Sequence, residues 1–182
     1  MKKQRFIGGF LLALMGILPS ACFAESNNTI EYSGKLIALP CTVHPQYENF
    51  GVYFGDNVNA KDLYTGERGT YSDKEFEFVL EDCDTSLGNT ISAKLSGNAS
   101  ADGLLKFDPS SEASGVVIGL ETMSGKRLPI NNTQVESLYP IKDGNMTIKL
   151  KAYLKADPEA IANQSIQSGW FNATLTYTLV YE

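Results

Sequence analysis

Residues 169–182 at the C-terminal end read GWFNATLTYTLVYE. Every second residue of this stretch is apolar or aromatic, and the residues between them are mostly polar. The apolar or aromatic set is Phe171, Ala173, Leu175, Tyr177, Leu179 and Tyr181. A period of two over this length predicts a β-strand with one buried and one solvated face. This strand is either the last strand of a closed sandwich or an edge strand that pairs with another protein.

The first 24 residues have the pattern of a secretory signal peptide. Three cationic residues precede an uncharged apolar run over 6–18, which is too short to span a bilayer. Small residues then lead to Ala24, after which we expect cleavage. An uncleaved anchor is one alternative. A lipoprotein cut before Cys22 is another, because 18–22 resemble a lipobox in which Pro19 replaces the usual leucine.

Cleavage after Ala24 leaves 158 of the 182 residues, enough for one domain with its own core. It also changes the formal net charge from −6 to −9, because it removes three cationic residues. An acidic chain of this kind does not follow nucleic acid or an anionic lipid surface.

Two cysteines remain in the mature chain, Cys41 and Cys83. In an exported protein two cysteines most often pair. A disulfide across this separation would stabilise the fold by roughly 4 kcal/mol in the chain-entropy model. Two reduced, buried thiols are the alternative.

Short alternating or apolar stretches recur along the rest of the chain and predict further strands. They lie at 30–43, 50–54, 74–83, 91–95, 104–107, 116–120 and 146–154. The segments 56–72 and 126–139 are rich in turn residues and predict loops. Asp157 followed by Pro158 is typical of a helix start, which predicts one short helix before the last strand. The fold class is therefore all-β, an immunoglobulin-like sandwich.

The sequence offers little for catalysis. Its single histidine, His44, argues against histidine-based chemistry and most transition-metal sites. Acidic residues around Cys83 lack the spacing of a calcium loop, and the pair Glu75 and Glu77 falls on the solvated face of a predicted strand. Neither a phosphate loop nor a nucleophile elbow occurs in the sequence. We therefore expect neither enzyme activity nor a metal or cofactor.

Four features together resemble the pilin subunits of chaperone–usher fimbriae of the P-pilus and type 1 kind. Gly169 is fourteenth from the C-terminus and Tyr181 is penultimate, with an alternating strand between them. Cys41 follows an amphipathic N-terminal stretch, and Cys83 ends a strand about forty residues later. A signal peptide precedes all of this, so the resemblance covers the whole mature chain.

The resemblance implies an incomplete immunoglobulin-like sandwich of six strands plus an N-terminal donor extension. The missing strand would leave a hydrophobic groove beside the last strand. A periplasmic chaperone fills such a groove first, and the extension of the next subunit replaces it at the outer-membrane usher, by β-augmentation. The chain would be exported through the periplasm to a fimbrium on the cell surface, where it serves cell adhesion.

Carried over residue by residue, the resemblance implies a signal peptide at 1–24, a donor extension at 25–36 and a pilin domain at 37–182. The groove and chaperone contacts would be Phe171, Ala173, Leu175, Tyr177, Leu179, Tyr181 and Glu182. The donor residues would be Ile30, Tyr32, Gly34 and Leu36. The extension is short, which favours a minor, tip or adaptor subunit.

Two other functions remain open from the residues alone. A self-complete secreted β-sandwich could bind carbohydrate or a small ligand, and an exported hydrolase could share the fold. A complete sandwich would be a stable monomer, whereas an incomplete one would need a partner strand.

Overall fold

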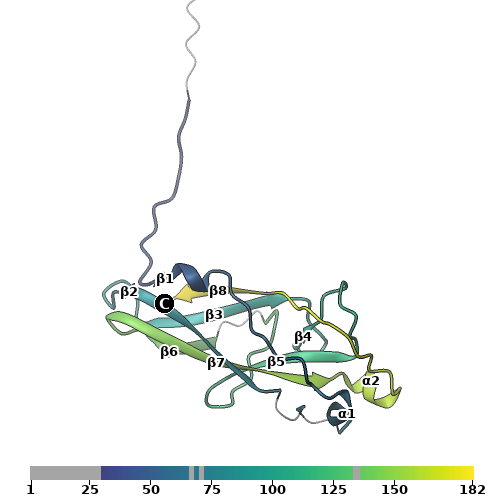
Figure 1. Cartoon of the computed structure of the whole chain (residues 1–182). Helices are drawn as coiled ribbons and strands as arrows, with labels where there is room; N and C mark the ends of the chain where they lie inside the picture. Colours follow the sequence, from purple (N-terminus) through teal and green to yellow (C-terminus); the bar gives the residue numbers. More distant parts are fainter. Residues whose placement is uncertain (1–29, 66–67, 70–71, 133–135) are drawn as a thin grey trace, which may run out of the picture. The chain divides into compact units, whose positions relative to one another are not determined.

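Strands are the main regular secondary structure of the chain from Thr42 onwards, with longer loops and a few short helices between them (Figure 1). The computed structural model describes residues 30–65, 68–69, 72–132 and 136–182, with the side chains of 136–138 left undescribed. The predicted signal peptide and residues 25–29 of the predicted extension lie outside this part. The described residues from 37 to 182 form one compact unit, and the described residues 30–36 belong to a separate unit.

The elements of the described residues follow one another in this order: β1 (Thr42–Val43), the 3-10 helix η1 (Pro45–Tyr47), α1 (Ala60–Leu63), β2 (Lys74–Cys83), β3 (Thr90–Gly97), β4 (Leu105–Lys106), β5 (Val116–Thr122), β6 (Glu136–Pro140), β7 (Gly144–Ala156), α2 (Pro158–Ala162) and β8 (Leu175–Tyr181).

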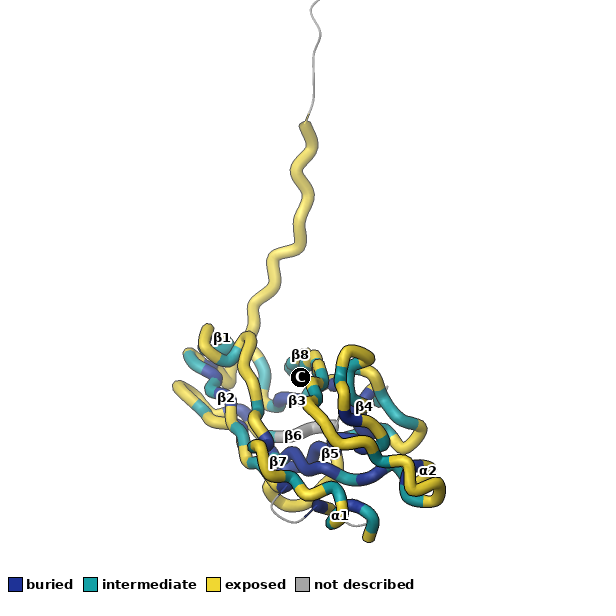
Figure 2. The backbone as a smooth tube through the Cα atoms, turned by 45° about the vertical axis from the view of Figure 1, so that its right-hand side comes forward, coloured by how far each residue is buried: buried dark blue, intermediate teal, exposed yellow. Residues whose placement is uncertain are grey.

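The strands form two antiparallel sheets. The larger has the order β1-β2-β7-β5-β4, and the smaller has the order β6-β3-β8. The core lies between them, and Leu80, Ile91, Ile148 and Leu154 are among its fully buried residues. Figure 2 shows the buried backbone, in dark blue, concentrated along β5 and β7 at the centre of the larger sheet.

Strand β5 is buried along its whole length, so both of its faces are covered. On the outer face, the ring of Tyr153 lies against Gly119, where a Cβ atom would overlap it. The guanidinium of Arg68 stacks 3.8 Å from the centre of the same ring and makes a bidentate ion pair with Glu121. These contacts attach the segment before β2 to the outside of the sheet.

The fold class predicted from the sequence is confirmed. Strand β2 begins at Lys74 and ends at Cys83, the limits that the alternation predicts. Helix α2 begins after Asp157, whose carboxylate accepts a hydrogen bond from the Glu159 backbone N–H at 3.0 Å. Cys41 and Cys83 form a disulfide.

The details of three predicted segments are wrong. The described residues contain eight strands, whereas the resemblance implies six. The segment 126–139 is predicted to be a loop, but it contains the start of β6, which pairs with β3. The stretch 50–54 is not a strand. Of the predicted strand 30–43, Thr42 and Val43 alone pair, with β2. A ladder needs a neighbour, and the described part of this chain supplies none for the remainder.

Candidate functional site

The pairing of β8 with β3 decides which way its backbone groups point. Tyr181 lies opposite Ile91, and the register continues to Leu175 opposite Gly97. One position further on, Glu182 and Thr90 exchange two hydrogen bonds of 3.1 Å. Hydrogen-bonded and non-bonded pairs alternate in an antiparallel ladder. The even-numbered residues of β8 therefore bond to β3, and the odd-numbered residues turn their N–H and C=O groups to the other edge.

The same orientation continues before β8, where the loop 108–114 replaces β3 as the neighbour. The Asp108 N–H donates to the Asn172 carbonyl at 2.8 Å. The N–H groups of Glu112 and Ala113 both donate to the Trp170 carbonyl, at 2.8 and 3.1 Å. Even-numbered residues are again the bonded ones.

The result is a continuous unpaired edge along the C-terminal segment. Strand β8 ends the smaller sheet, and within the described residues nothing hydrogen-bonds to the backbone of its odd positions or of the two odd positions before it. These six residues are Phe171, Ala173, Leu175, Tyr177, Leu179 and Tyr181, and we call their outward backbone groups the free edge. None of the six is proline, so each offers both a donor and an acceptor.

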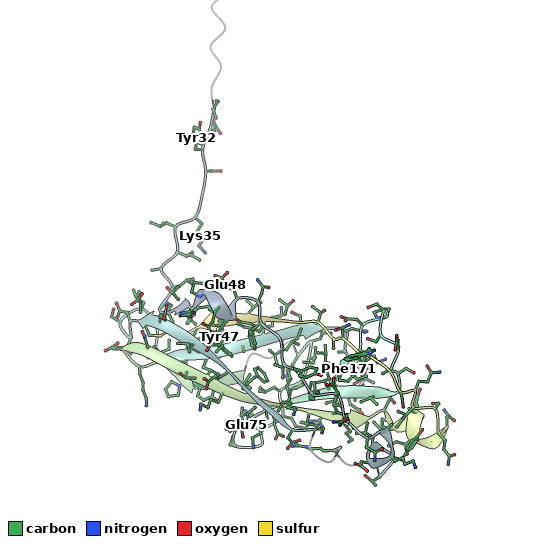
Figure 3. The ribbon with its side chains drawn as sticks, in the orientation of Figure 1. Tyr32, Lys35, Tyr47, Glu48, Glu75 and Phe171 are labelled. Carbon is green, nitrogen blue, oxygen red and sulfur yellow. A yellow bond between two sulfur atoms is a disulfide. The ribbon has the colours of Figure 1, made fainter. Side chains whose placement is uncertain are left out.

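The side chains of these six residues pack against the core but are all only half-buried. The ring of Phe171 stacks on Phe107 at 4.3 Å between centroids and lies 6.0 Å from Phe54. The ring of Tyr177 stacks on Phe78 at 5.2 Å. In Figure 3, the labelled Phe171 and the labelled Tyr47 of η1 lie in different parts of the compact unit. An apolar row therefore remains partly accessible on the same residues whose backbone is unpaired.

Two tyrosine hydroxyls connect this segment to the start of the compact unit. Tyr177 donates to the Tyr47 carbonyl at 2.6 Å, and Tyr181 donates to the Cys41 carbonyl at 3.2 Å. Burial raises the pKa of both phenols, so both remain protonated donors at neutral pH. The disulfide holds Cys41 to the end of β2, and these contacts position the segment 41–47 near β8.

Gly169 and Glu182, the two ends of the C-terminal segment, make separate contacts with the rest of the unit. At Gly169 the backbone φ is +153°, and a Cβ atom would lie 2.6 Å from the Glu112 Cβ. This close approach explains why glycine stands there. At the other end, the Glu182 main-chain oxygen accepts hydrogen bonds from the N–H groups of Asn89 and Thr90, at 2.9 and 3.1 Å. The Glu182 side chain is exposed.

The predicted donor residues belong to the other unit of the chain. Residues 30–36 form no helix or strand, and Ile30, Tyr32 and Leu36 are 71%, 90% and 100% exposed. At Gly34 an added Cβ atom would meet nothing within 4 Å. Their assignment as a donor strand stays a prediction.

His44, the single histidine, has a structural role. The Nδ1 atom of His44 accepts a hydrogen bond from the Gln46 N–H and caps η1, while its Nε2 atom lies 3.8 Å from Glu81. Within the described residues, no group of three or more His, Cys, Asp or Glu could hold a metal ion. The same part of the chain contains no helix long and apolar enough to cross a membrane.

The sequence did not predict the residues from other parts of the chain that bond to the C-terminal segment and hold the free edge in place. Tyr47 contributes a carbonyl, and Asp108 and Ser111 bond to the segment before β8. The turn-rich composition of 108–114 predicts a loop. It carries no signal for the segment that this loop contacts more than fifty residues later.

A family model described as "Fimbrial protein" matches residues 30–182. The chain belongs to the fimbrial protein family. It is 30% identical over 178 residues to the fimbrial-like protein YfcP of Escherichia coli K12, covering 96% of this chain and 95% of that protein.

Two solved structures of pilus proteins share the fold. The P pilus rod subunit PapA has a TM-score of 0.67 at 17% identity, covering 79% of this chain and 100% of PapA. A chaperone–usher pilus structure has a TM-score of 0.66 at 16% identity, covering 90% of this chain and 100% of its own.

Family membership gives this fimbrial protein a structural role. It is a pilin subunit and not an enzyme, it is exported, and it assembles with other pilin subunits into a fimbria on the cell surface. Its disulfide and its two-sheet sandwich are features of the described structure itself.

Proposed function

We propose that this fimbrial subunit polymerises by strand donation, with the free edge of β8 as the receiving surface. One observation carries the proposal: the six residues with outward backbone groups are the same six whose apolar side chains are half-buried. A strand added at this edge would satisfy the backbone groups and cover the apolar row together. Unpaired edges otherwise favour aggregation.

We call the half-buried side chains of the six free-edge residues the receiving row. The donor is residues 25–36 of a neighbouring subunit, with Ile30, Tyr32, Gly34 and Leu36 against this row. Their exposed apolar side chains and lack of secondary structure fit a segment that becomes ordered on pairing. The division into a signal peptide at 1–24, this extension and a pilin domain at 37–182 belongs to the same proposal. The short extension favours a minor, tip or adaptor position in the fibre.

Before assembly, a periplasmic chaperone lends the strand, and the outer-membrane usher is where the exchange occurs. In the complex with the chaperone, the carboxylate of Glu182 would meet basic residues of the chaperone, a charge-assisted contact. The Glu182 side chain is exposed and therefore accessible for this contact.

Periplasmic expression with and without a fimbrial chaperone tests the receiving edge. We expect a soluble one-to-one complex with the chaperone on size exclusion, and aggregation or degradation without it. A stable monomer that ignores the chaperone would contradict an open edge and would indicate a complete sandwich.

Deletion of residues 25–36 tests the donor assignment separately. The shortened chain should still form the chaperone complex, because β8 is unchanged, but it should not extend a fibre as a donor. Normal incorporation as a donor would contradict the assignment of this segment.

A further inference from the structure

The loop 108–114 bonds to the part of the C-terminal segment that β3 does not reach. The ladder between β3 and β8 ends at Gly97 opposite Leu175, so 169–174 lie beyond it. Two side chains of the loop bond there. The Asp108 carboxylate accepts from the Thr174 N–H at 3.3 Å and from the Thr174 hydroxyl at 2.9 Å.

Ser111 makes the second set of contacts. Its hydroxyl accepts from the Asn172 N–H at 3.0 Å and donates to the Asn172 carbonyl at 3.1 Å. One serine side chain therefore satisfies both backbone groups of Asn172, as a neighbouring strand would. With the backbone bonds from the loop, all three even-numbered residues from 170 to 174 have partners on this side.

We propose that Asp108 and Ser111 are positioning residues that lengthen the receiving edge to include Phe171 and Ala173. This inference rests on the proposed strand donation. By bonding Asn172 and Thr174 from one side, they hold the N–H and C=O groups of the two odd residues outward, in phase with β8. A partner strand then meets six receiving residues in one register instead of the four within β8.

Contacts at both ends of the loop 108–114 keep it next to the C-terminal segment. Phe107, which precedes the loop, stacks on Phe171 at 4.3 Å with nearly parallel rings. At the far end, Gly169 allows the backbone to approach Glu112. The hydrogen bonds of Asp108 and Ser111 therefore act between two fixed contacts and determine the backbone orientation between them.

Amide hydrogen exchange tests the proposal residue by residue, with the full exported, oxidised chain transferred from its chaperone complex to a synthetic peptide of residues 25–39, which serves as the partner strand at saturating concentration. In the wild type we expect the peptide to protect the amides of the six odd residues from Phe171 to Tyr181. In Asp108→Ala/Ser111→Ala we expect protection at 175–181 to remain and protection at Phe171 and Ala173 to be lost. The affinity for the peptide should fall about tenfold, because two of six cross-strand pairs are lost.

Two further variants keep the result interpretable. Asp102→Ala removes another exposed loop aspartate, whose described hydrogen bond is made by its backbone carbonyl, and it should behave as the wild type. Asp108→Asn keeps one acceptor oxygen for the Thr174 N–H, and it should retain protection at Ala173. It also serves as the milder variant should the double substitution not fold. Unchanged protection of β2 and β7 amides is the folding control.

The outcomes distinguish failure of the positioning role of Asp108 and Ser111 from failure of strand donation. Equal protection of Phe171 and Ala173 in the double variant would overturn the positioning role. Loss of protection along all of 171–181 in a folded variant would also overturn it, because the loop would then act on the whole strand. No protection at any of the six residues in the wild type would contradict strand donation itself.

Discussion

Arg68 connects three groups on the outer face of the larger sheet. It makes a bidentate ion pair with Glu121, stacks on Tyr153 and lies 3.7 Å from Asp73. The Glu121 side chain is only 5% exposed, whereas that of Arg68 is 40% exposed. The pair therefore compensates for burying a carboxylate and is partly screened by solvent.

We predict that Glu121→Gln lowers the free energy of unfolding by about 1–2 kcal/mol at neutral pH. The hydrogen bond from Arg68 holds the pKa of Glu121 below its usual value. A lowered folded-state pKa stabilises above the unfolded-state pKa, about 4.3, and this stabilisation is lost as the pH falls through the folded value. The difference between variant and wild type should therefore shrink under acid conditions.

Urea unfolding at neutral and acid pH measures this difference. Glu77→Gln is the matched control, because Glu77 forms an exposed cross-strand pair with Lys149 at 3.4 Å and should change stability by less than about 0.5 kcal/mol. A gap for Glu121→Gln that stays constant with pH would show that the charge of Glu121 is not its source.

Among the elements, β8 combines two properties that a strand in the middle of a sheet does not have. Its odd-numbered residues have unpaired backbone groups within the described structure, and the side chains of the same residues are half-buried. Its even-numbered residues bond to β3, and most of their side chains are exposed. Substitutions on odd and even positions should therefore differ sharply in their effect on partner binding.

We predict that Leu179→Ala weakens binding of the 25–39 peptide at least tenfold, whereas Thr178→Ala changes it less than threefold. Leu179 lies in the receiving row, and Thr178 is exposed on the opposite face. Fluorescence anisotropy with a labelled peptide measures both affinities. Similar losses from the two substitutions would contradict the assignment of the receiving face.

Elements with a strong local pattern could be predicted from the sequence, and elements made by distant contacts could not. The alternation of β2 and the Asp157 cap of α2 are local signals, and both predictions are confirmed. Strand β6 depends on pairing with β3, more than forty residues earlier. The role of Asp108 depends on Thr174, sixty-six residues away. In both cases the decisive partner is absent from the local sequence.

In the compact unit as a whole, the disulfide joins Cys41, near the start of that unit, to Cys83 at the end of β2. It fixes the position of Cys41, whose carbonyl accepts the Tyr181 hydroxyl. The link therefore stabilises the sandwich and also supports the C-terminal end of the receiving row.

We predict that Cys41→Ala/Cys83→Ala lowers the free energy of unfolding by roughly 4 kcal/mol, the chain-entropy value for a link across 42 residues. Urea unfolding of the oxidised wild type and of the variant measures the loss. A reducing agent should destabilise the wild type by a similar amount and leave the variant unchanged. Equal sensitivity of both proteins to the reductant would contradict the prediction.

The position of Trp170 has a practical consequence. It is the single tryptophan of the sequence and is 68% exposed, and its backbone groups bond to the loop 108–114 immediately before Phe171. Its intrinsic fluorescence therefore arises from one known place, at the junction between loop and receiving row. Emission wavelength and quenching by iodide should report when that junction loosens or becomes covered. The chain thus carries its own optical probe for the kinetics of strand exchange, without an attached dye.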